Sequence, residues 1–348
     1  MIECINLTKL FGELTAVNNF CFKLKEKEFI SILGPSGCGK STLLRLIAGL
    51  EVPSRGKVML YNQEISGEKI TLAPENRKFG MIFQDFTLFP HLSVKENISF
   101  GVNGSKKEKI FRVEELLNLV NLPHLSEKMP HQISGGEQQR IAVARALAPK
   151  PRLILMDEPF SNLDYKLRQQ LRYDIRNILK KNGVATILVT HDQVEAITFS
   201  EKVILMKDGE LLQSGSPIEI YNYPKTLWAS KFVGESNHLS AKWKGNALRT
   251  TIGHLNVPAE IGEKTKFLVV RPEDFIIESN NGNTHNGKVK SIEFLGPTQN
   301  IEVELCNGET INITDSPHLF HHINEIVNVK VKRFLCFNDA GEIILDLN

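Results

Sequence analysis

The sequence predicts two domains of different fold class: an α/β domain over residues 1–235 that carries a helical subdomain, and a small all-β domain over residues 236–348. Three observations predict this organisation. In the first part, apolar β-rich runs alternate with helical patterns, as in α/β domains. Amphipathic helical patterns fill residues 86–150. Beyond residue 237, short alternating runs separated by Asn-Gly pairs predict a small barrel, OB-like, or a sandwich.

Three apolar runs frame the predicted α/β domain: Phe29–Leu33, Leu153–Met156 and Ala185–Thr190. The second run is apolar on both faces, which is typical of a central parallel strand. Between the last two runs, apolar residues recur at helical spacing and predict an intervening helix. They are Leu167, Leu171, Ile175 and Ile178.

The remaining elements follow from the same two periodicities. Helical spacing predicts amphipathic helices over Glu108–Leu122 and Glu137–Ala148. In the second domain, Lys288–Ile292 and Ile301–Leu305 alternate in the way of half-buried strands. The Asn-Gly pairs at 281–282, 286–287 and 307–308 are expected to form the turns between strands.

Composition excludes several classes of protein. The formal net charge of +2 is too small to argue for nucleic acid or an acidic membrane surface. Five scattered cysteines without a CxxC pair predict a reducing compartment and neither a disulfide scaffold nor a zinc knuckle. The first residues do not resemble a signal peptide, and no apolar run approaches the ~20 residues that span a bilayer. Any membrane role is therefore expected to depend on a partner.

A glycine-rich segment joins the run Phe29–Leu33 to a predicted helix and matches G-x-x-x-x-G-K-[ST] in full. Backbone N–H groups of such a turn surround phosphate oxygens, and the helix N-terminus adds partial positive charge. Lys40 is expected to reach the β- and γ-phosphates, and the Ser41 hydroxyl to bind Mg²⁺. The predicted phosphate-binding residues are Gly34, Pro35, Ser36, Gly37, Cys38, Gly39, Lys40, Ser41 and Thr42.

Two acidic residues, Asp157 and Glu158, follow the run Leu153–Met156. Ligands of open α/β sheets bind beyond the carboxyl ends of the strands. We therefore expect Asp157 to hold Mg²⁺ and Glu158 to polarise a water aimed at the γ-phosphate. Together with the glycine-rich loop, this pair predicts a P-loop NTPase.

The segment from Ile133 to Arg140 reads Ile-Ser-Gly-Gly-Glu-Gln-Gln-Arg and resembles the signature sequence of ABC ATPases. The common form begins Leu-Ser-Gly-Gly-Gln, so Ile133 and Glu137 depart from it. A small Ser-Gly-Gly before a helix is also a sound anion site on physical grounds. The resemblance implies that Ser134, Gly135, Gly136 and Glu137 serve the nucleotide bound by the opposite subunit.

Further residues occur in the order of the family's motifs, and the resemblance covers nearly all of residues 1–235. Phe11 resembles the aromatic residue that stacks on adenine, and Gln84 resembles the Q-loop glutamine that contacts Mg²⁺ or the lytic water. Asp164, in the segment Ser161-Asn162-Leu163-Asp164, resembles the D-loop aspartate at the dimer seam. His191 resembles the switch histidine that contacts the γ-phosphate.

The resemblance implies an ATPase that binds ATP and Mg²⁺, works as a homodimer and drives an integral membrane permease. It also implies an indirect partnership with a solute-binding protein, no nucleic acid, and a peripheral position at the cytoplasmic face of the inner membrane. Phe86, Leu88 and Phe89 are candidates to line a groove for a permease helix.

The C-terminal stretches Val270–Asp274 and Ile292–Gly296 resemble the accessory barrel of importer ATPases, with a role in regulation or plain stability. Phe83–Leu92 and the segments around Ala146–Pro151 and Asp157–Asp164 resemble ferric iron importers most, so ferric iron is the expected substrate. Polyamine, sulfate or molybdate, and sugar importers are the alternatives.

Two other functional classes compete. A soluble ABC ATPase acting on nucleic acid or ribosomes usually has two nucleotide domains or a coiled-coil insertion, and this chain has neither. A GTPase or kinase would leave the signature segment unexplained, and no Asn-Lys-x-Asp motif occurs.

No metal or redox role is expected for a group of three histidines in the second domain or for the cysteine of the glycine-rich segment. His318, His321 and His322 are expected to lie in a surface loop without a convergent carboxylate. Cys38 is expected to have a lowered thiol pKa, because it lies near a helix N-terminus.

Overall fold

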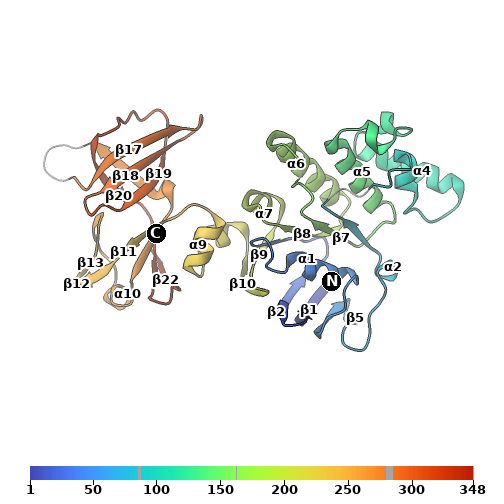
Figure 1. Cartoon of the computed structure of the whole chain (residues 1–348), viewed down its shortest axis with the longest axis horizontal. Helices are drawn as coiled ribbons and strands as arrows, with labels where there is room; N and C mark the ends of the chain where they lie inside the picture. Colours follow the sequence, from blue (N-terminus) through green and yellow to red (C-terminus); the bar gives the residue numbers. More distant parts are fainter. Residues whose placement is uncertain (85–87, 162, 280–284, 348) are drawn as a thin grey trace. The chain divides into compact units, whose positions relative to one another are not determined.

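The computed structural model describes residues 1–84, 88–161, 163–279 and 285–347. The chain forms two compact units, Met1–Pro217 and Ile218–Asn348 (Figure 1). The first combines α-helices with β-sheets, and the second is almost entirely β, so the predicted fold classes are confirmed.

The main sheet of the first unit has six strands in the order β10-β9-β3-β8-β7-β6. All neighbouring pairs are parallel except β10 with β9. Every residue of β3, β7 and β8 is buried, which explains why these strands read as continuous apolar runs. The strands are β3 (Phe29–Leu33), β6 (Phe79–Ile82), β7 (Leu153–Asp157), β8 (Ala185–Thr190), β9 (Lys202–Lys207) and β10 (Glu210–Gly215).

A second, antiparallel sheet of the first unit has the order β2-β1-β4-β5. One apolar core joins this sheet, helix α1 (Lys40–Ala48) and one face of the main sheet. Leu153 and Leu155 of β7 belong to this core, as the two-residue period of a strand requires. The strands are β1 (Ile2–Phe11), β2 (Leu14–Leu24), β4 (Arg55–Leu60) and β5 (Gln63–Ser66).

Helices cover the other face of the main sheet (Figure 1). Ile154 and Met156 of β7 point into this second core, opposite to Leu153 and Leu155. The predicted helices are confirmed with shifted ends: α4 begins at Lys106, and α5 begins at Gly135. The helices on this face are α3 (Val94–Ser99), α4 (Lys106–Leu119), α5 (Gly135–Leu147), α6 (Tyr165–Lys181) and α7 (Gln193–Phe199), with 3₁₀ turns η1 (Pro123–Leu125) and η2 (Pro130–Gln132). The short helix α2 (Pro74–Arg77) lies against α1 instead, where the Arg77 guanidinium donates to the carbonyl of Ile47 at 2.8 Å.

The second unit holds three sheets around one core, with orders β11-β15-β21-β22, β12-β13-β14 and β16-β20-β17-β18-β19. Its strands are β11 (Asn237–Ser240), β12 (Lys242–Lys244), β13 (Ala247–Thr250), β14 (Gly253–Leu255), β15 (Phe267–Val270), β16 (Phe275–Ser279), β17 (Gly287–Phe294), β18 (Gln299–Leu305), β19 (Thr310–Asp315), β20 (Ile326–Val331), β21 (Phe334–Phe337) and β22 (Ile343–Leu347). Its helices are α8 (Pro217–Asn222), α9 (Leu227–Val233), α10 (Ala259–Gly262) and the 3₁₀ turn η3 (Pro272–Asp274).

Arg271 explains why the compact units divide before the predicted sequence boundary at residue 235. Its guanidinium donates to the carbonyl oxygens of Ser230, Gly234 and Glu235, each at 2.9 Å. It also donates to the carbonyl of Tyr221 at 2.8 Å and lies over that tyrosine ring. These bonds fasten the α8–α9 segment to the β-domain, so the boundary near 235 lies within the second unit.

The Asn-Gly pairs turn out to have different roles. The pair at 307–308 makes the predicted turn between β18 and β19. The pair at 286–287 does not, because Gly287 begins β17 and Asn286 bonds in both directions to the backbone of Val329. The pair at 281–282 lies outside the described residues. Within the described chain, no helix is long and apolar enough to cross a membrane.

Candidate nucleotide-binding and hydrolysis site

The phosphate loop runs from the end of β3 to the start of α1, and two of its glycines are required by close backbone neighbours. Gly39 has φ 101°, and a Cβ there would lie 1.9 Å from the carbonyl oxygen of Ala16. A Cβ on Gly34 would lie 2.2 Å from the carbonyl oxygen of Met206. The loop is therefore pressed between β9 and the start of β2, and only glycine fits at these positions.

Lys40 lies at the centre of this loop. Its buried ammonium donates to the carbonyl oxygens of Gly34 and Pro35, each at 2.8 Å. An ammonium has three N–H donors, so one remains for a phosphate oxygen. The first turn of α1 contains no acidic residue, and no side chain caps it, so its N–H groups are left for an anion.

Ser41 and Asp157 meet at the carboxyl edge of the main sheet. The Ser41 hydroxyl donates to Asp157 Oδ1 at 2.8 Å. Burial raises the pKa of the Asp157 carboxyl, against the opposing effect of the Ser41 hydrogen bond. A hydroxyl and a carboxylate are hard oxygen ligands, and Mg²⁺ in such sites takes one or two from the protein and the rest from phosphate and water. The donor set therefore fits the predicted Mg²⁺.

Glu158 and His191 form a second pair, contributed by the ends of the neighbouring strands β7 and β8. His191 Nδ1 lies 2.9 Å from Glu158 Oε2. Glu158 has φ 45°, and its N–H donates to the carbonyl of Val189 at 2.9 Å. This left-handed backbone conformation is uncommon outside glycine and follows directly after the last residue of β7.

A cleft of about 510 Å³ lies over the phosphate loop. Phe11, which is 45% exposed, lines one wall, with Lys9 Nζ 4.8 Å from its ring centroid. An exposed aromatic face beside a phosphate loop is suited to stacking on a base. The lining residues are Phe11, Leu14, Thr15, Ala16, Ser36, Gly37, Cys38, Gly39, Lys40, Ser41, Thr42, Glu158, Asp208 and Gly209.

Sequence reasoning missed the contribution of Asp208 and Gly209 to this cleft. They form the turn between β9 and β10, and the Gly209 N–H donates to the carbonyl of Cys38 at 3.1 Å. The Asp-Gly pair was a readable hairpin signal, but only the pairing of β9 with β3 brings it to the loop.

The expectation of a lowered pKa at Cys38 is wrong. Burial raises the thiol pKa, and the opposing effects of the Lys40 charge and of backbone hydrogen bonds are smaller. The side chain is only 6% exposed. Proximity to a helix N-terminus is therefore outweighed by desolvation.

The signature segment begins α5 with a complete capping box. Glu137 Oε2 accepts from the Ser134 N–H at 2.7 Å and from the Ser134 hydroxyl at 2.8 Å. These two hydrogen bonds lower the pKa of the Glu137 carboxyl. A Cβ on Gly136 would lie 3.0 Å from Leu167 of α6, so this glycine lets two helices approach closely. The common signature sequence has glutamine at the position of Glu137. The capping box explains the glutamate here, because glutamate and glutamine both close such a box.

The other motif residues lie apart from the cleft lining. Gln84 is exposed at the end of β6, and Asp164 caps α6 by accepting from the Leu167 N–H at 3.0 Å. Phe86 and Asn162 lie outside the described residues. Within the described part of the chain, the cleft lining includes no residue of the signature segment.

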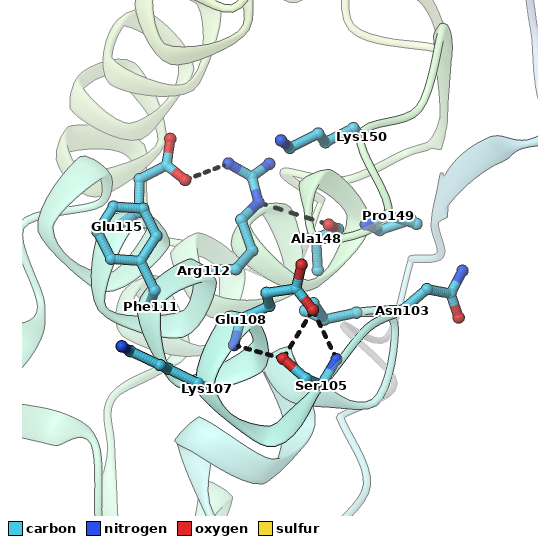
Figure 2. A pocket seen from close by; sticks show the side chains of 11 residues that line it. Asn103, Ser105, Lys107, Glu108, Phe111, Arg112, Glu115, Ala148, Pro149 and Lys150 are labelled. Carbon is cyan, nitrogen blue, oxygen red and sulfur yellow. Dashed lines mark hydrogen bonds and ion pairs between the residues drawn. The ribbon is translucent and has the colours of Figure 1, made fainter.

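A larger hollow of about 760 Å³ lies beside α4 and contains none of the predicted site residues. Figure 2 shows Arg112 directed towards Glu115 and the end of α5. Its guanidinium donates to Glu115 at 2.7 Å and to the carbonyl of Leu147 at 2.8 Å. A cation at a helix C-terminus is favourable, so Arg112 stabilises the far end of the signature helix.

The expectation for the histidine loop is partly wrong, because carboxylates do converge on His321. Asp315 Oδ2 lies 3.4 Å from its Nε2, and Glu325 Oε2 lies 3.6 Å from its Nδ1. Asp315 faces one ring nitrogen and Glu325 faces the other. A metal ion bound to either nitrogen would therefore have only one of the two carboxylates beside it. Within the described chain, no group of three metal-ligating side chains is found.

The chain is similar to known proteins over most of its length. A family model for ABC transporters matches residues 17–161, and a TOBE domain model matches residues 268–336. The spermidine/putrescine import ATP-binding protein PotA of Mesorhizobium japonicum is 40% identical over 328 residues, covering 90% of this chain and 89% of that protein. PotA of Escherichia coli strain K12 is 37% identical over 347 residues, covering 93% and 90%.

Two solved structures of the ATP-binding cassette MJ0796 are also similar. A dimer in a post-hydrolysis state with ADP and Pi has 35% identity and a TM-score of 0.54, covering 62% of this chain and 99% of that chain. A second dimeric structure, described as a bacterial ABC transporter cassette, has 36% identity and a TM-score of 0.55 with the same coverage. The chain belongs to the importer-type ATP-binding subunits of ABC transporters that carry a C-terminal TOBE domain.

Proposed function

We propose that this chain binds ATP in the cleft over the phosphate loop and hydrolyses it as one half of a homodimer that drives polyamine uptake. One observation carries the catalytic part. Two polar pairs, Ser41–Asp157 and Glu158–His191, lie at the carboxyl edge of the main sheet. One pair suits a metal ion and the other suits the activation of water.

The loop side of the site holds the phosphates. The remaining N–H of Lys40 and the open N–H groups of α1 are donors for β- and γ-phosphate oxygens. Ser41 and Asp157 would hold Mg²⁺, which would supply positive charge to neutralise the transferred phosphoryl group. Positioning and charge stabilisation account for most of the catalysis of this reaction.

Glu158 is the proposed general base, and His191 is proposed to contact the γ-phosphate. A carboxylate only accepts hydrogen bonds, so His191 Nδ1 carries the proton that lies between the two side chains. A hydrogen bond from His191 Nε2 to a phosphate oxygen would then need a second proton on the ring, at Nε2, because a ring protonated at Nδ1 alone has only an acceptor there. The contact with His191 Nδ1 keeps the Glu158 carboxylate at the strand edge, where a water can lie between it and the phosphorus atom.

The homodimer proposal follows from what the cleft lacks. Its described lining has no donor from the signature segment, although α5 begins with a Ser-Gly-Gly suited to an anion. Ser134 and Gly136 of a second chain would close the γ-phosphate from the other side. ATP would then favour the closed dimer, and hydrolysis would remove the group that bridges it. The similar cassette MJ0796 is a dimer.

A permease is the proposed membrane partner, which would hold the chain peripherally at the cytoplasmic face of the inner membrane. Phe89 and Phe100 support a docking surface after Gln84: their ring centroids lie 4.7 Å apart, and Phe100 is 70% exposed. Leu88 packs against the helical core instead. A solute-binding protein would be an indirect partner, and no role with nucleic acid is proposed.

The substrate we propose is a polyamine, in place of the ferric iron expected from the sequence. The two relatives named above each match about nine-tenths of this chain and are spermidine/putrescine import ATP-binding proteins. This whole-chain similarity supports a polyamine better than the resemblance of a few short segments to ferric importers supports iron. A motor subunit does not touch the substrate, so short segments near the catalytic site carry little information on what is transported.

Uptake measurements test this proposal. A deletion strain would be assayed with radiolabelled putrescine, spermidine, ferric iron and sulfate, and complemented with the wild-type chain or the Glu158→Gln variant. Polyamine uptake should be lost and should return only with the wild type. Normal polyamine uptake, in a strain without a redundant importer, together with lost iron or sulfate uptake would reject the substrate.

A further inference from the structure

Thr190 and Glu195 form a buried polar contact that the mechanism above does not use. Thr190, the last residue of β8, is 1% exposed, and Glu195 of α7 is 2% exposed. The Thr190 hydroxyl donates to Glu195 Oε2 at 2.6 Å. A short hydrogen bond to a buried carboxylate belongs to the strong class, and burying such a carboxylate is costly. The hydrogen bond from Thr190 therefore compensates part of the cost of burying the Glu195 side chain.

The same hydroxyl fixes the backbone on the far side of His191. Thr190 Oγ1 accepts from the Asp192 N–H at 3.0 Å, and Asp192 Oδ1 accepts from the Glu195 N–H at 2.9 Å. Residues 190 and 192 are thus both held by one closed set of hydrogen bonds. His191 stands between them, and its own side chain is 51% exposed.

Arg168 connects this set to the loop that carries Glu158. Its guanidinium lies 3.4 Å from Asp192 Oδ2 and donates to the carbonyls of Leu163 at 2.9 Å and Ser161 at 3.2 Å. The Ser161 hydroxyl in turn donates to the Glu158 carbonyl at 3.0 Å. Hydrogen bonds of Arg168 and Ser161 therefore join the loops after β7 and β8, which carry Glu158 and His191.

We propose that Thr190 and Glu195 are positioning residues for ATP hydrolysis, which hold the backbone around His191 so that its imidazole meets Glu158. This inference rests on the role proposed above for His191. The half-exposed imidazole has one hydrogen bond among the described residues, the one to Glu158, so its place depends on the backbone at 190 and 192. Small displacements at a reacting centre are costly in rate.

The chain offers a matched control on the same strand. Thr186 is also fully buried in β8, and its hydroxyl donates to the carbonyl of Val184 at 3.4 Å, away from His191. Thr190→Val and Thr186→Val remove the same hydroxyl from the same strand. Both variants replace a buried hydroxyl of β8 by a methyl group, whereas an effect on His191 is expected only in Thr190→Val.

We expect Thr190→Val to lower kcat for ATP by about 10-fold with KM within about two-fold, as for the loss of one charge-assisted hydrogen bond. Thr186→Val should keep kcat within about two-fold. Glu195→Gln, which retains an oxygen acceptor, should be faster than Glu195→Leu. In a His191→Ala background, Thr190→Val should cause no further loss of kcat.

Three outcomes would overturn the inference in distinguishable ways. Equal kcat for Thr190→Val and Thr186→Val would reject positioning while the role of His191 stands. A full additional loss in the His191→Ala background would show that Thr190 acts elsewhere. Wild-type hydrolysis by His191→Ala itself would reject the proposed catalytic site, and the inference with it. Thermal unfolding of each variant would be measured to confirm that the compared proteins are folded.

Discussion

Helices α1 and α5 both begin at glycine-rich turns, but their N-termini are completed in different ways. At α1 the N-cap is Gly39 in a left-handed conformation, with no side-chain cap and no acidic residue in the first turn. At α5 the N-cap is Ser134, whose hydroxyl accepts from the Glu137 N–H while Glu137 bonds back to Ser134. One helix start is left open, and the other is closed by its own side chains.

We infer from this difference that two similar glycine turns serve different stages of the proposed site. The open start of α1 can bind phosphate within a single chain, with Lys40 already inside the loop. The capping box of α5 uses two donors and places a carboxylate at the helix start, leaving the N–H groups of Gly135 and Gly136 without intrahelical partners. We infer that α5 supplies fewer donors and acts only when a second chain brings it to a bound nucleotide.

The largest expected effect separates binding from turnover. Glu158→Gln should reduce ATP hydrolysis by about 10²–10⁴-fold, the usual contribution of a general base, and leave ATP binding at the open α1 start intact. The bound variant should form a stable dimer with ATP on gel filtration. Glu201→Gln, which changes an exposed glutamate paired with Lys180, is the control. Hydrolysis by Glu158→Gln at the wild-type rate would contradict the role given to Glu158.

Mixing two inactive variants tests whether α5 serves the opposite chain. Ser134→Arg should keep ATP affinity and stop hydrolysis, and Lys40→Ala should fail at its own phosphate loop. A mixed dimer has one site with both defects and one with neither, so activity should return to the mixture. Subunit mixing would be verified by differently tagged chains. Proven mixed dimers without any activity would count against a site shared between chains.

Much of the fold could be predicted because its main strands are buried on both faces. The ends predicted for Phe29–Leu33 and Ala185–Thr190 agree with the structure, since neither run contains a charged residue. The start of α5 was placed at Glu137 rather than Gly135, because Gly-Gly reads as a turn. Here Ser134 and Glu137 together fix the helix start, and that box could have been read from the spacing.

The site was predictable where sequence neighbours act together and not where distant segments meet. The phosphate loop and Asp157 followed from local pattern and strand ends. The Glu158–His191 contact and the entry of Asp208 into the cleft needed the order of strands in the sheet. The expected direction of the Cys38 pKa shift was wrong because the sequence motif does not show how deeply the thiol is buried, and burial raises its pKa.

A smaller effect concerns the carboxylate that closes α5. Its hydrogen bonds with Ser134 lower the pKa of Glu137 below the ordinary value of 4.5, so they stabilise the fold above that pH and are lost as pH falls through the lowered pKa. Glu137→Gln keeps a capping side chain without the charge. It should cost no more than about 1 kcal/mol at pH 7 and weaken the loss of stability from pH 5 to pH 3.

Thermal unfolding at a series of pH values measures this effect. Glu114→Gln, on an exposed position of α4, is the matched control and should retain the wild-type pH dependence. An unchanged acid dependence in Glu137→Gln would mean that the capping box is not formed in solution. A large loss at pH 7 would mean that Glu137 has a further partner.

The smallest expected effect is at Cys38, beside the open start of α1. A helix N-terminus and the Lys40 ammonium favour a thiolate, but burial disfavours it more and raises the thiol pKa. Cys21 and Cys306, which are exposed, should therefore react with maleimide first, and hydrolysis should survive while Cys38 remains unlabelled. Mass spectrometry of peptides from briefly treated protein would give the order of labelling, with Cys38→Ser as the control for any lost activity. Labelling of Cys38 as fast as Cys21, suppressed by ATP, would show that the phosphate loop opens more readily than its packing against Met206 and Ala16 indicates.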